Sequence, residues 1–294
     1  MKRSIHHKLV PYYFLIPLLA IVVPLLIYPI FRGIVMSFFD LKGLSPELKN
    51  FTGFGNYQYI FSNPRFLNSA ITTVAYTIYC VVFTLLVGLF SATLLNARFP
   101  GRTAARVAMT LPWAIPEVAC VMIWVFMFDP NFGVFNNILM NLGVINHYGK
   151  WLNDVNTAFP SVIATTIWKI FPFSTIVILT ALQTVPTELY EVAKIDGANA
   201  LSVYTRITLP LIRPTLMLLM LLNTIWSFKR FTIIWLSTQG GPSGTTENLV
   251  ILMYKYIFQM FKPGLAAAVG VMGLLLTMVI TVVYFVIQKK QEAY

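Results

Sequence analysis

The chain has 294 residues, of which 57% are hydrophobic and only 11% are charged. A soluble domain usually carries about 25% charged residues, so the composition excludes an ordinary soluble fold and favours a lipid environment. The formal net charge of +11 does not indicate nucleic-acid binding. The bases lie at the ends of apolar segments, and none of them forms a run interleaved with stacking aromatic residues.

Six apolar segments are each long enough to cross the roughly 30 Å hydrocarbon core of a bilayer as a helix. We predict spans at residues 12–37, 69–96, 107–128, 159–182, 212–237 and 265–287. The connections are polar or rich in Gly, Pro and Asn, and no span shows the alternation of a membrane β-barrel. There is no internal repeat and no linker, so we expect one all-α, polytopic domain over residues 1–294.

The first span follows a basic N-terminus, as in a signal peptide. Its apolar run is longer than the roughly 7–15 residues of a signal sequence and lacks a clear cleavage site. We therefore expect this helix to be retained.

Basic residues are unevenly divided between the two sides of the predicted bundle. One side carries Lys2, Arg3, Lys8, Arg98, Arg102, Arg106, Lys194, Arg206, Arg213, Lys289 and Lys290, and the other carries Lys42, Lys49, Arg65, Lys150, Lys255 and Lys262. Cytoplasmic loops are richer in Lys and Arg. The first set therefore predicts the cytoplasmic side, which places both termini inside the cell.

Two outer segments, residues 51–66 and 248–261, combine apolar residues with spaced aromatics. Both are compatible with helices at the membrane interface, where Tyr and Phe settle at headgroup depth. A binding surface for an external partner is the alternative.

The chain offers no convergent set of catalytic or metal-binding side chains. Cys80 and Cys120 lie inside apolar segments without metal-ligand spacing. His6 and His7 precede the first span, whereas His147 lies in an outer loop, so the histidines cannot meet in a site. We expect no metal and no enzyme activity.

The loop at residues 183–210 reads QTVPTELYEVAKIDGANALSVYTRITLP. Pro186 suits the first turn of a helix, and Glu188 and Glu191 follow in turns where carboxylates are favourable. Gly197 is a helix stop. A second short helix over about 200–207 is expected to end at Leu209 and Pro210, where the next membrane helix begins.

This helix–turn–helix is expected to expose an apolar surface. Its members are Leu189, Tyr190, Val192, Ala193, Ile195, Ala198 and Leu201. Such a surface predicts a partner.

The same loop resembles ABC importer permeases, which carry Glu-Ala-Ala, three residues, Gly, nine residues and Ile-x-Leu-Pro. The matching residues are Glu191, Val192, Ala193, Gly197, Ile207, Leu209 and Pro210, with Val192 in place of the first Ala. The resemblance implies a coupling helix, within about 183–211, that seats in a groove of a nucleotide-binding subunit. The implied ATPase-coupling residues are these seven together with Glu188 and Asp196.

The chain has no Gly-x-x-x-x-Gly-Lys-Ser/Thr loop for phosphate. The resemblance therefore implies that ATP and Mg²⁺ are bound by a separate subunit, and that this chain binds no cofactor.

A second stretch, residues 226–248 (WSFKRFTIIWLSTQGGPSGTTEN), resembles carbohydrate importers of the maltose and glycerol-phosphate kind. The matching residues are Thr238, Gly240, Gly241, Pro242, Thr246, Glu247 and Leu249. Membership implies a related second permease, an ATP-binding subunit dimer and an extracytoplasmic binding protein in a bacterial or archaeal cytoplasmic membrane. The implied cargo is a sugar or sugar derivative, with a phosphorylated polyol or other anionic solute as the alternative.

Ionisable residues inside membrane spans are candidates for function. Glu117 lies about 16 Å into the membrane beyond Arg106, and Lys169 reaches a similar depth from the other face. They are candidate pathway residues, with a structural Glu117–Lys169 ion pair as the alternative.

Lys229 and Arg230 lie about 24 Å beyond Arg213 on the fifth predicted span, with no acid near them in the sequence. They either extend towards the outer surface or face the pathway. Arg230 would share a helix face with Asn223 and Ser227. The remaining pathway candidates are the aromatic residues Trp168 and Trp226, for which packing in the core is the alternative.

Overall fold

The computed structural model describes the backbone of residues 3–43 and 47–292 and the side chains of residues 13–43 and 47–289. In these ranges the fold is helical, and the sole β feature is an isolated bridge between Phe39 and Phe51. The all-α prediction is confirmed. Lys2 lies outside the described residues, as do the side chains of Arg3, Lys8 and Lys290 that entered the orientation argument.

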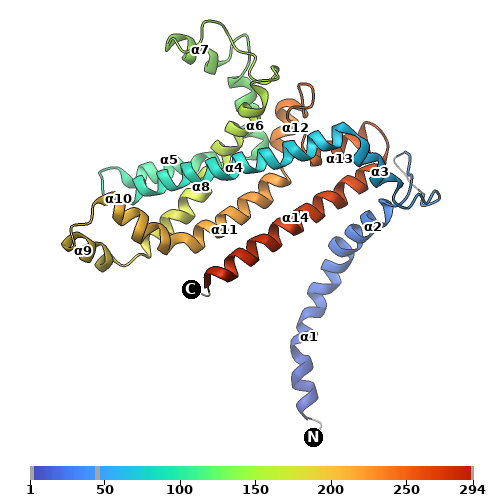
Figure 1. Ribbon diagram of the computed structural model, residues 1–294, viewed down its shortest axis with the longest axis horizontal. Coiled ribbons are helices and arrows are strands. Elements are labelled where there is room, and N and C mark those ends of the chain that lie inside the picture. The colour runs from blue at the N-terminus through green and yellow to red at the C-terminus, as the bar shows by residue number, and fades with distance from the viewer. Residues whose placement is uncertain (1–2, 44–46, 293–294) are drawn as a thin grey trace. The chain divides into compact units, whose positions relative to one another are not determined.

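The chain divides into two compact units, and Figure 1 labels the helices that they contain. Unit 1 holds residues 1–66 and 252–276, and unit 2 holds residues 67–251 and 277–294. The helices α4 (Pro64–Asn96), α13 (Leu249–Phe258) and α14 (Pro263–Glu292) contribute residues to both units. That the chain is a single domain stays a prediction.

Unit 1 begins with α1 (Arg3–Val22), a π-helical turn η1 (Val23–Ile27) and α2 (Tyr28–Met36). The buried Asn56 of α3 (Gly55–Ser62) donates to the carbonyls of Ser37 and Phe39 at 2.9 and 2.8 Å. The segment 51–66 thus contains the predicted helix. Hydrogen bonds of Asn56 fix the start of this helix to the residues that follow α2.

Unit 2 contains the remaining helices. They are α5 (Arg102–Ala114), α6 (Glu117–Met127), α7 (Val134–Asn141), α8 (Ala158–Gln183), α9 (Thr187–Ile195), α10 (Ala200–Val203), the π-helical turn η2 (Tyr204–Thr208), α11 (Leu209–Phe228) and α12 (Thr232–Thr238). The central helix is α8, which packs on α5, α11 and α12. One apolar cluster surrounds Val162 and Ile163 at its start, and another surrounds Ile178 and Leu182 at its end.

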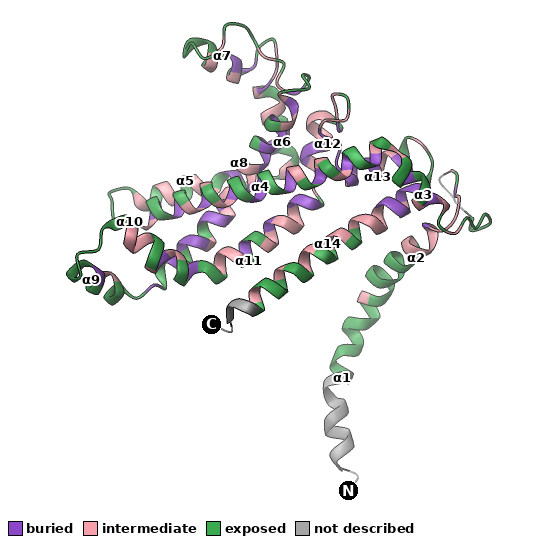
Figure 2. Cartoon of the chain, viewed as in Figure 1, coloured by how far each residue is buried: buried purple, intermediate pink, exposed green. Residues whose placement is uncertain are grey.

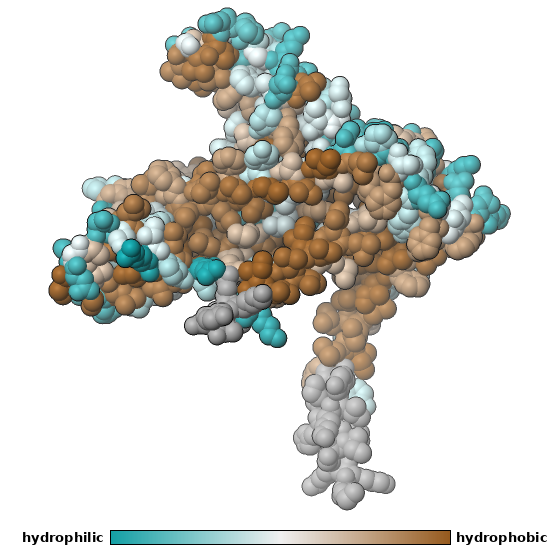
Figure 3. Space-filling model, viewed as in Figure 1, coloured by the Kyte–Doolittle hydropathy of each residue, from teal (hydrophilic) through white to brown (hydrophobic). Residues whose placement is uncertain are grey.

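Burial and hydropathy follow this arrangement within unit 2. Buried residues run along α8, whereas α9 is largely exposed (Figure 2). Figure 3 shows an apolar surface along α4 and hydrophilic residues near α9. Five described helices are long and apolar enough to span a membrane, or six if the bent pair α5 and α6 counts as one span.

The third predicted span, residues 107–128, is wrong as a continuous helix. α5 ends at Ala114, α6 begins at Glu117, and the two differ in direction by 95°. Pro116 explains the break. It has no N–H to donate, and it forces Ile115 out of the helical region, to a ψ of 135°.

The fifth predicted span, residues 212–237, is also interrupted. α11 ends at Phe228 and α12 begins at Thr232. The Asn248 side-chain amide donates to the Arg230 carbonyl at 2.7 Å, so the buried Asn248 satisfies a carbonyl that the broken helix leaves without a helical partner.

Candidate functional site

The predicted coupling helix is present as α9, which runs from Thr187 to Ile195. Pro186 precedes its first turn as the N-cap residue. At the other end the amides of Gly197 and Ala198 donate to the carbonyls of Lys194 and Ala193. This is a Schellman ending, which needs a left-handed residue, and Gly197 supplies it with a φ of +73°.

One side of α9 is attached to the body of unit 2. Ala193 is buried, and Tyr190 packs against the apolar cluster at the end of α8. The Tyr190 hydroxyl lies 3.2 Å from that of Thr208 in η2. The expectation that Tyr190 and Ala193 are exposed is therefore wrong, because these two residues seat the helix.

The opposite side of α9 is open. Ile195 is 85% exposed and Val192 is 57% exposed, and Leu189, Ala198 and Leu201 are exposed as predicted. Glu188, Glu191 and Asp196 are also exposed. An apolar surface rimmed by acids is thus available for a partner.

The second stretch of the loop does not end at Leu209 and Pro210. α10, η2 and α11 form one continuous helical run from Ala200 to Phe228. Pro210 lacks an N–H to donate, so the chain widens to a π-helical turn before it instead of breaking. Ile207 is half-buried, and Leu209 packs on the same cluster as Tyr190.

A pocket of about 500 Å³ lies where the two interrupted spans meet α8. We call it the break pocket. It is lined by Trp113, Glu117, Lys169, Ile170, Trp226, Lys229, Arg230, Phe231 and Thr232.

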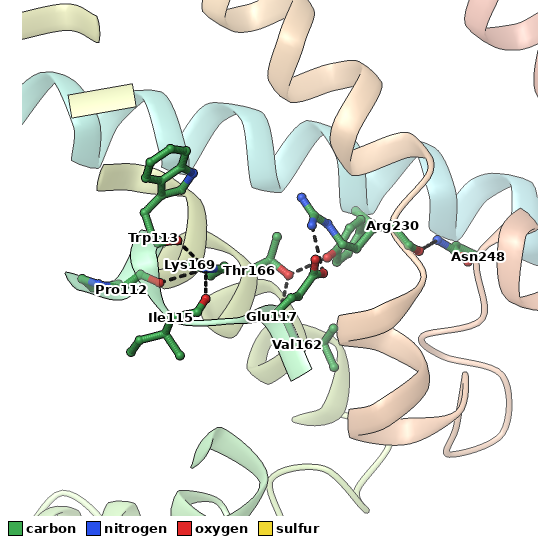
Figure 4. A network of polar contacts seen from close by, with 10 residues as sticks. Pro112, Trp113, Ile115, Glu117, Val162, Thr166, Lys169, Arg230 and Asn248 are labelled. Atoms are coloured by element: carbon green, nitrogen blue, oxygen red, sulfur yellow. Dashed lines mark hydrogen bonds and ion pairs between the residues drawn. The ribbon is translucent and has the colours of Figure 1, made fainter. Parts of the chain in front are cut away.

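The Lys169 ammonium of α8 is held by the end of α5 (Figure 4). It donates to the carbonyls of Pro112, at 3.1 Å, Trp113, at 2.7 Å, and Ile115. These carbonyls lie at the α5 C-terminus, where the helix dipole favours a cation. The ammonium thus replaces donors that the broken helix lacks.

Glu117 pairs with Arg230, at 3.0 Å between Oε1 and Nη1 (Figure 4). Arg230 is thus not without a nearby acid. The alternative of a structural Glu117–Lys169 pair is wrong, because Lys169 instead binds backbone carbonyls. The pair connects the first residue of α6 to the interruption between α11 and α12.

The other predicted pathway residues separate into two groups. Trp226 lines the break pocket, and its ring packs on Phe173, 5.2 Å between centroids. Asn223 and Ser227 are buried, and Asn223 donates to Ser174 at 3.2 Å. Because α11 ends before Lys229, the helix face expected to unite Asn223, Ser227 and Arg230 does not form.

Trp168 is not among the pocket-lining residues. Its ring packs edge-on against Trp124 at 5.6 Å, which supports the packing alternative.

Sequence reasoning missed Phe231 and Thr232 in the pocket lining and Asn248 as the residue that holds the Arg230 backbone. The polar run Thr245–Asn248 beside a long apolar segment was an available signal. Within it Thr246 donates to the Gly241 carbonyl at 2.9 Å, and directly after it the backbone N–H of Leu249 donates to the Thr73 hydroxyl oxygen at 2.9 Å. The Gly-Gly-Pro stretch thus fixes the chain that reaches Asn248.

Residues 85–293 match the family model of the binding-protein-dependent transport system inner membrane component. The trehalose/maltose transport system permease protein MalF of Thermococcus litoralis is 34% identical, over 93% of this chain and 91% of the relative. The sn-glycerol-3-phosphate transport system permease protein UgpA of Brucella suis is 30% identical, over 100% of this chain and 99% of the relative.

Solved structures agree with this match. The fold is similar to a chain of a bacterial alginate ABC transporter in complex with an alginate pentasaccharide-bound periplasmic protein. The TM-score is 0.82 at 25% identity, over 96% of this chain and 94% of the other. The resemblance to ABC importer permeases is confirmed, and the chain belongs to the family of binding-protein-dependent transport system inner membrane components.

Proposed function

We propose that this chain is one of two permease subunits of an ABC importer that moves a sugar or sugar derivative into the cytoplasm by alternating access. The observation that carries the proposal is the geometry of α9, an exposed helix attached to the membrane helices by Tyr190 and Ala193. ATP and Mg²⁺ would be bound by a separate ATP-binding subunit dimer, with α9 in a groove of one of its members. The exposed Glu191 is the charge expected to meet a basic group there.

Two contacts can transmit a motion of α9 to the membrane helices. The Tyr190–Thr208 contact connects α9 to η2, which continues directly into α11. The Tyr204 hydroxyl lies 2.9 Å from that of Thr93, which connects η2 to α4. A short helix held in this way transmits motion that a flexible loop would absorb, so ATP-driven closure of the partner would move α11 and α4 together.

The break pocket is the proposed passage for the solute. Transporter sites commonly lie where interrupted helices meet near the bilayer midplane, and both interruptions contribute to this pocket. Trp113 and Trp226 offer ring faces, and Glu117, Lys229 and Arg230 offer polar groups. A sugar needs both kinds of contact.

The relatives support a carbohydrate as cargo, because one is named for trehalose and maltose. The relative named for glycerol 3-phosphate keeps a phosphorylated polyol as the alternative. The structural neighbour was solved with a periplasmic solute-bound protein, which supports an extracytoplasmic binding protein as a partner. We accordingly place the chain in a bacterial or archaeal cytoplasmic membrane.

The decisive experiment is Glu191→Ala in the full transporter, reconstituted in proteoliposomes with its binding protein. We expect ATP-driven uptake to fall at least tenfold, while Glu47→Ala, a change at an exposed outer-loop carboxylate, leaves uptake unchanged. Deletion of residues 188–197 should abolish uptake. A channel that needs no ATPase would survive both changes, so solute flux that persists without ATP in the deletion variant would refute the proposal.

A further inference from the structure

The break pocket has an unequal number of positive and negative side chains. Its charged lining residues are Glu117, Lys169, Lys229 and Arg230. One carboxylate thus lies among three cations. A buried charge is unfavourable unless it is paired and hydrogen-bonded. The partners of each cation therefore indicate which of the three can bind a ligand.

Two of the three cations already have partners. Arg230 is paired with Glu117, and its side chain is only 13% exposed. Lys169 uses its ammonium donors on the carbonyls of Pro112, Trp113 and Ile115. Lys169 is available for a ligand only if it gives up these contacts, and the Arg230 Nε, which has no hydrogen-bond partner, is buried.

Lys229 differs from both. It is exposed, it lines the pocket beside Trp226 and Phe231, and its side chain makes no hydrogen bond or ion pair with the described part of the chain. It is the C-cap residue of α11, where the helix end supports a positive charge. Its neighbours Arg230 and Phe231 belong to the interruption that Asn248 fixes, so the backbone carrying Lys229 is held in place.

We propose that the break pocket prefers an acidic saccharide, whose anionic group binds Lys229 while its rings stack on Trp113 or Trp226. The inference rests on the proposed function and names the substrate class of the same site. An anion would balance the surplus positive charge and form a charge-assisted hydrogen bond, which is stronger than one to a neutral hydroxyl. A neutral sugar would leave the ammonium uncompensated.

Binding to the complete, detergent-purified transporter without ATP tests the preference by isothermal titration calorimetry. The first pair of probes is trigalacturonic acid and its methyl ester, which differ in charge and little in shape. The second pair is glucose 6-phosphate and glucose, which separates a phosphate from a carboxylate. We expect the acidic member of at least one pair to bind about tenfold more tightly than the neutral member.

Lys229 itself is tested by two substitutions and a control. Lys229→Gln should remove most of the preference, and Lys229→Arg should retain it. Lys150→Gln, at an exposed lysine outside the pocket, should leave it unchanged. Equal binding of both members in each pair, no binding of any probe, or a preference unaltered in Lys229→Gln would each overturn the inference.

The same preparation separates this inference from the proposed function. ATPase activity is measured with and without the binding protein. Stimulation without any acidic preference leaves the importer and removes the acidic substrate, whereas absence of stimulation by the solute-loaded binding protein contradicts the importer itself.

Discussion

Glu117 and Arg230 form an ion pair in the break pocket. Removal of one leaves a partly buried charge without its hydrogen bond, which costs about 1–3 kcal/mol. We expect Glu117→Gln and Arg230→Gln each to lower the melting temperature of the purified complex. The exchanged pair Glu117→Arg with Arg230→Glu should recover part of the loss. Additive losses in the exchanged pair would show that the two residues act separately.

Lys169 provides a second prediction at the residue scale. Lys169→Met keeps an unbranched side chain, one atom shorter, but leaves the carbonyls of Pro112, Trp113 and Ile115 without their donor. Backbone carbonyls left without a donor inside a membrane span are unfavourable, so the melting temperature should fall by several degrees. Lys229→Met is the matched control in the same pocket and should change it little, since substitutions away from such contacts usually shift stability by less than about 0.5 kcal/mol. Equal falls would contradict a holding role for Lys169.

The sequence identified these charges as candidates but did not identify their partners. Glu117, Lys169, Lys229 and Arg230 stand out because ionisable residues are rare in membrane spans. Their pairing depends on where two helices break, and depth along an ideal helix ignores the break. Pro116 was visible in the sequence, yet a proline within a span often only kinks a helix. The 95° change of direction between α5 and α6 could therefore be known only from the structure.

At the scale of elements, Gly197 controls how α9 ends. A Cβ at this position would meet no other atom within 4 Å, but the φ of +73° is left-handed. Gly197→Ala therefore carries only the conformational penalty of roughly 1–2 kcal/mol. We expect faster hydrogen exchange of the α9 amides and a severalfold fall in ATP-driven uptake.

The matched control is Gly33→Ala in α2, where the added Cβ also meets no atom within 4 Å and the backbone is not left-handed. It should leave uptake and α9 exchange unchanged. If Gly197→Ala behaved in the same way, the Schellman ending would have no role in coupling.

The elements of the loop at residues 183–210 were largely predictable, because the sequence signals that begin and end a helix are local. Pro186 directly precedes α9, and Gly197 follows its C-cap residue Asp196. The continuous run from Ala200 to Phe228 was not predictable in this way, because Pro210 reads as a boundary when the tertiary support from Leu209 and the cluster at the end of α8 is unknown.

At the scale of the whole molecule, the two functions proposed for the chain use different parts of unit 2. The exposed surface of α9 is the proposed contact for the ATP-binding subunit, whereas the break pocket lies among α5, α6, α8, α11 and α12. α11 joins them, since its run begins at Ala200 beside α9 and ends at Phe228 beside the pocket. A change in the position of α9 therefore reaches the residues that line the pocket through one helix.

This arrangement requires that α9 and α7 lie on opposite sides of the membrane, which the base distribution predicts with α9 inside. Single cysteines at Ile195 in α9's last turn and at Leu142 after α7 test it, because these side chains are 85% and 70% exposed. Cys80 and Cys120 are buried and are replaced by Ser to give a silent background. We expect a membrane-impermeant maleimide to label Leu142→Cys in intact spheroplasts, and Ile195→Cys only after permeabilisation. The reverse pattern would invert the orientation and separate α9 from any cytoplasmic ATPase.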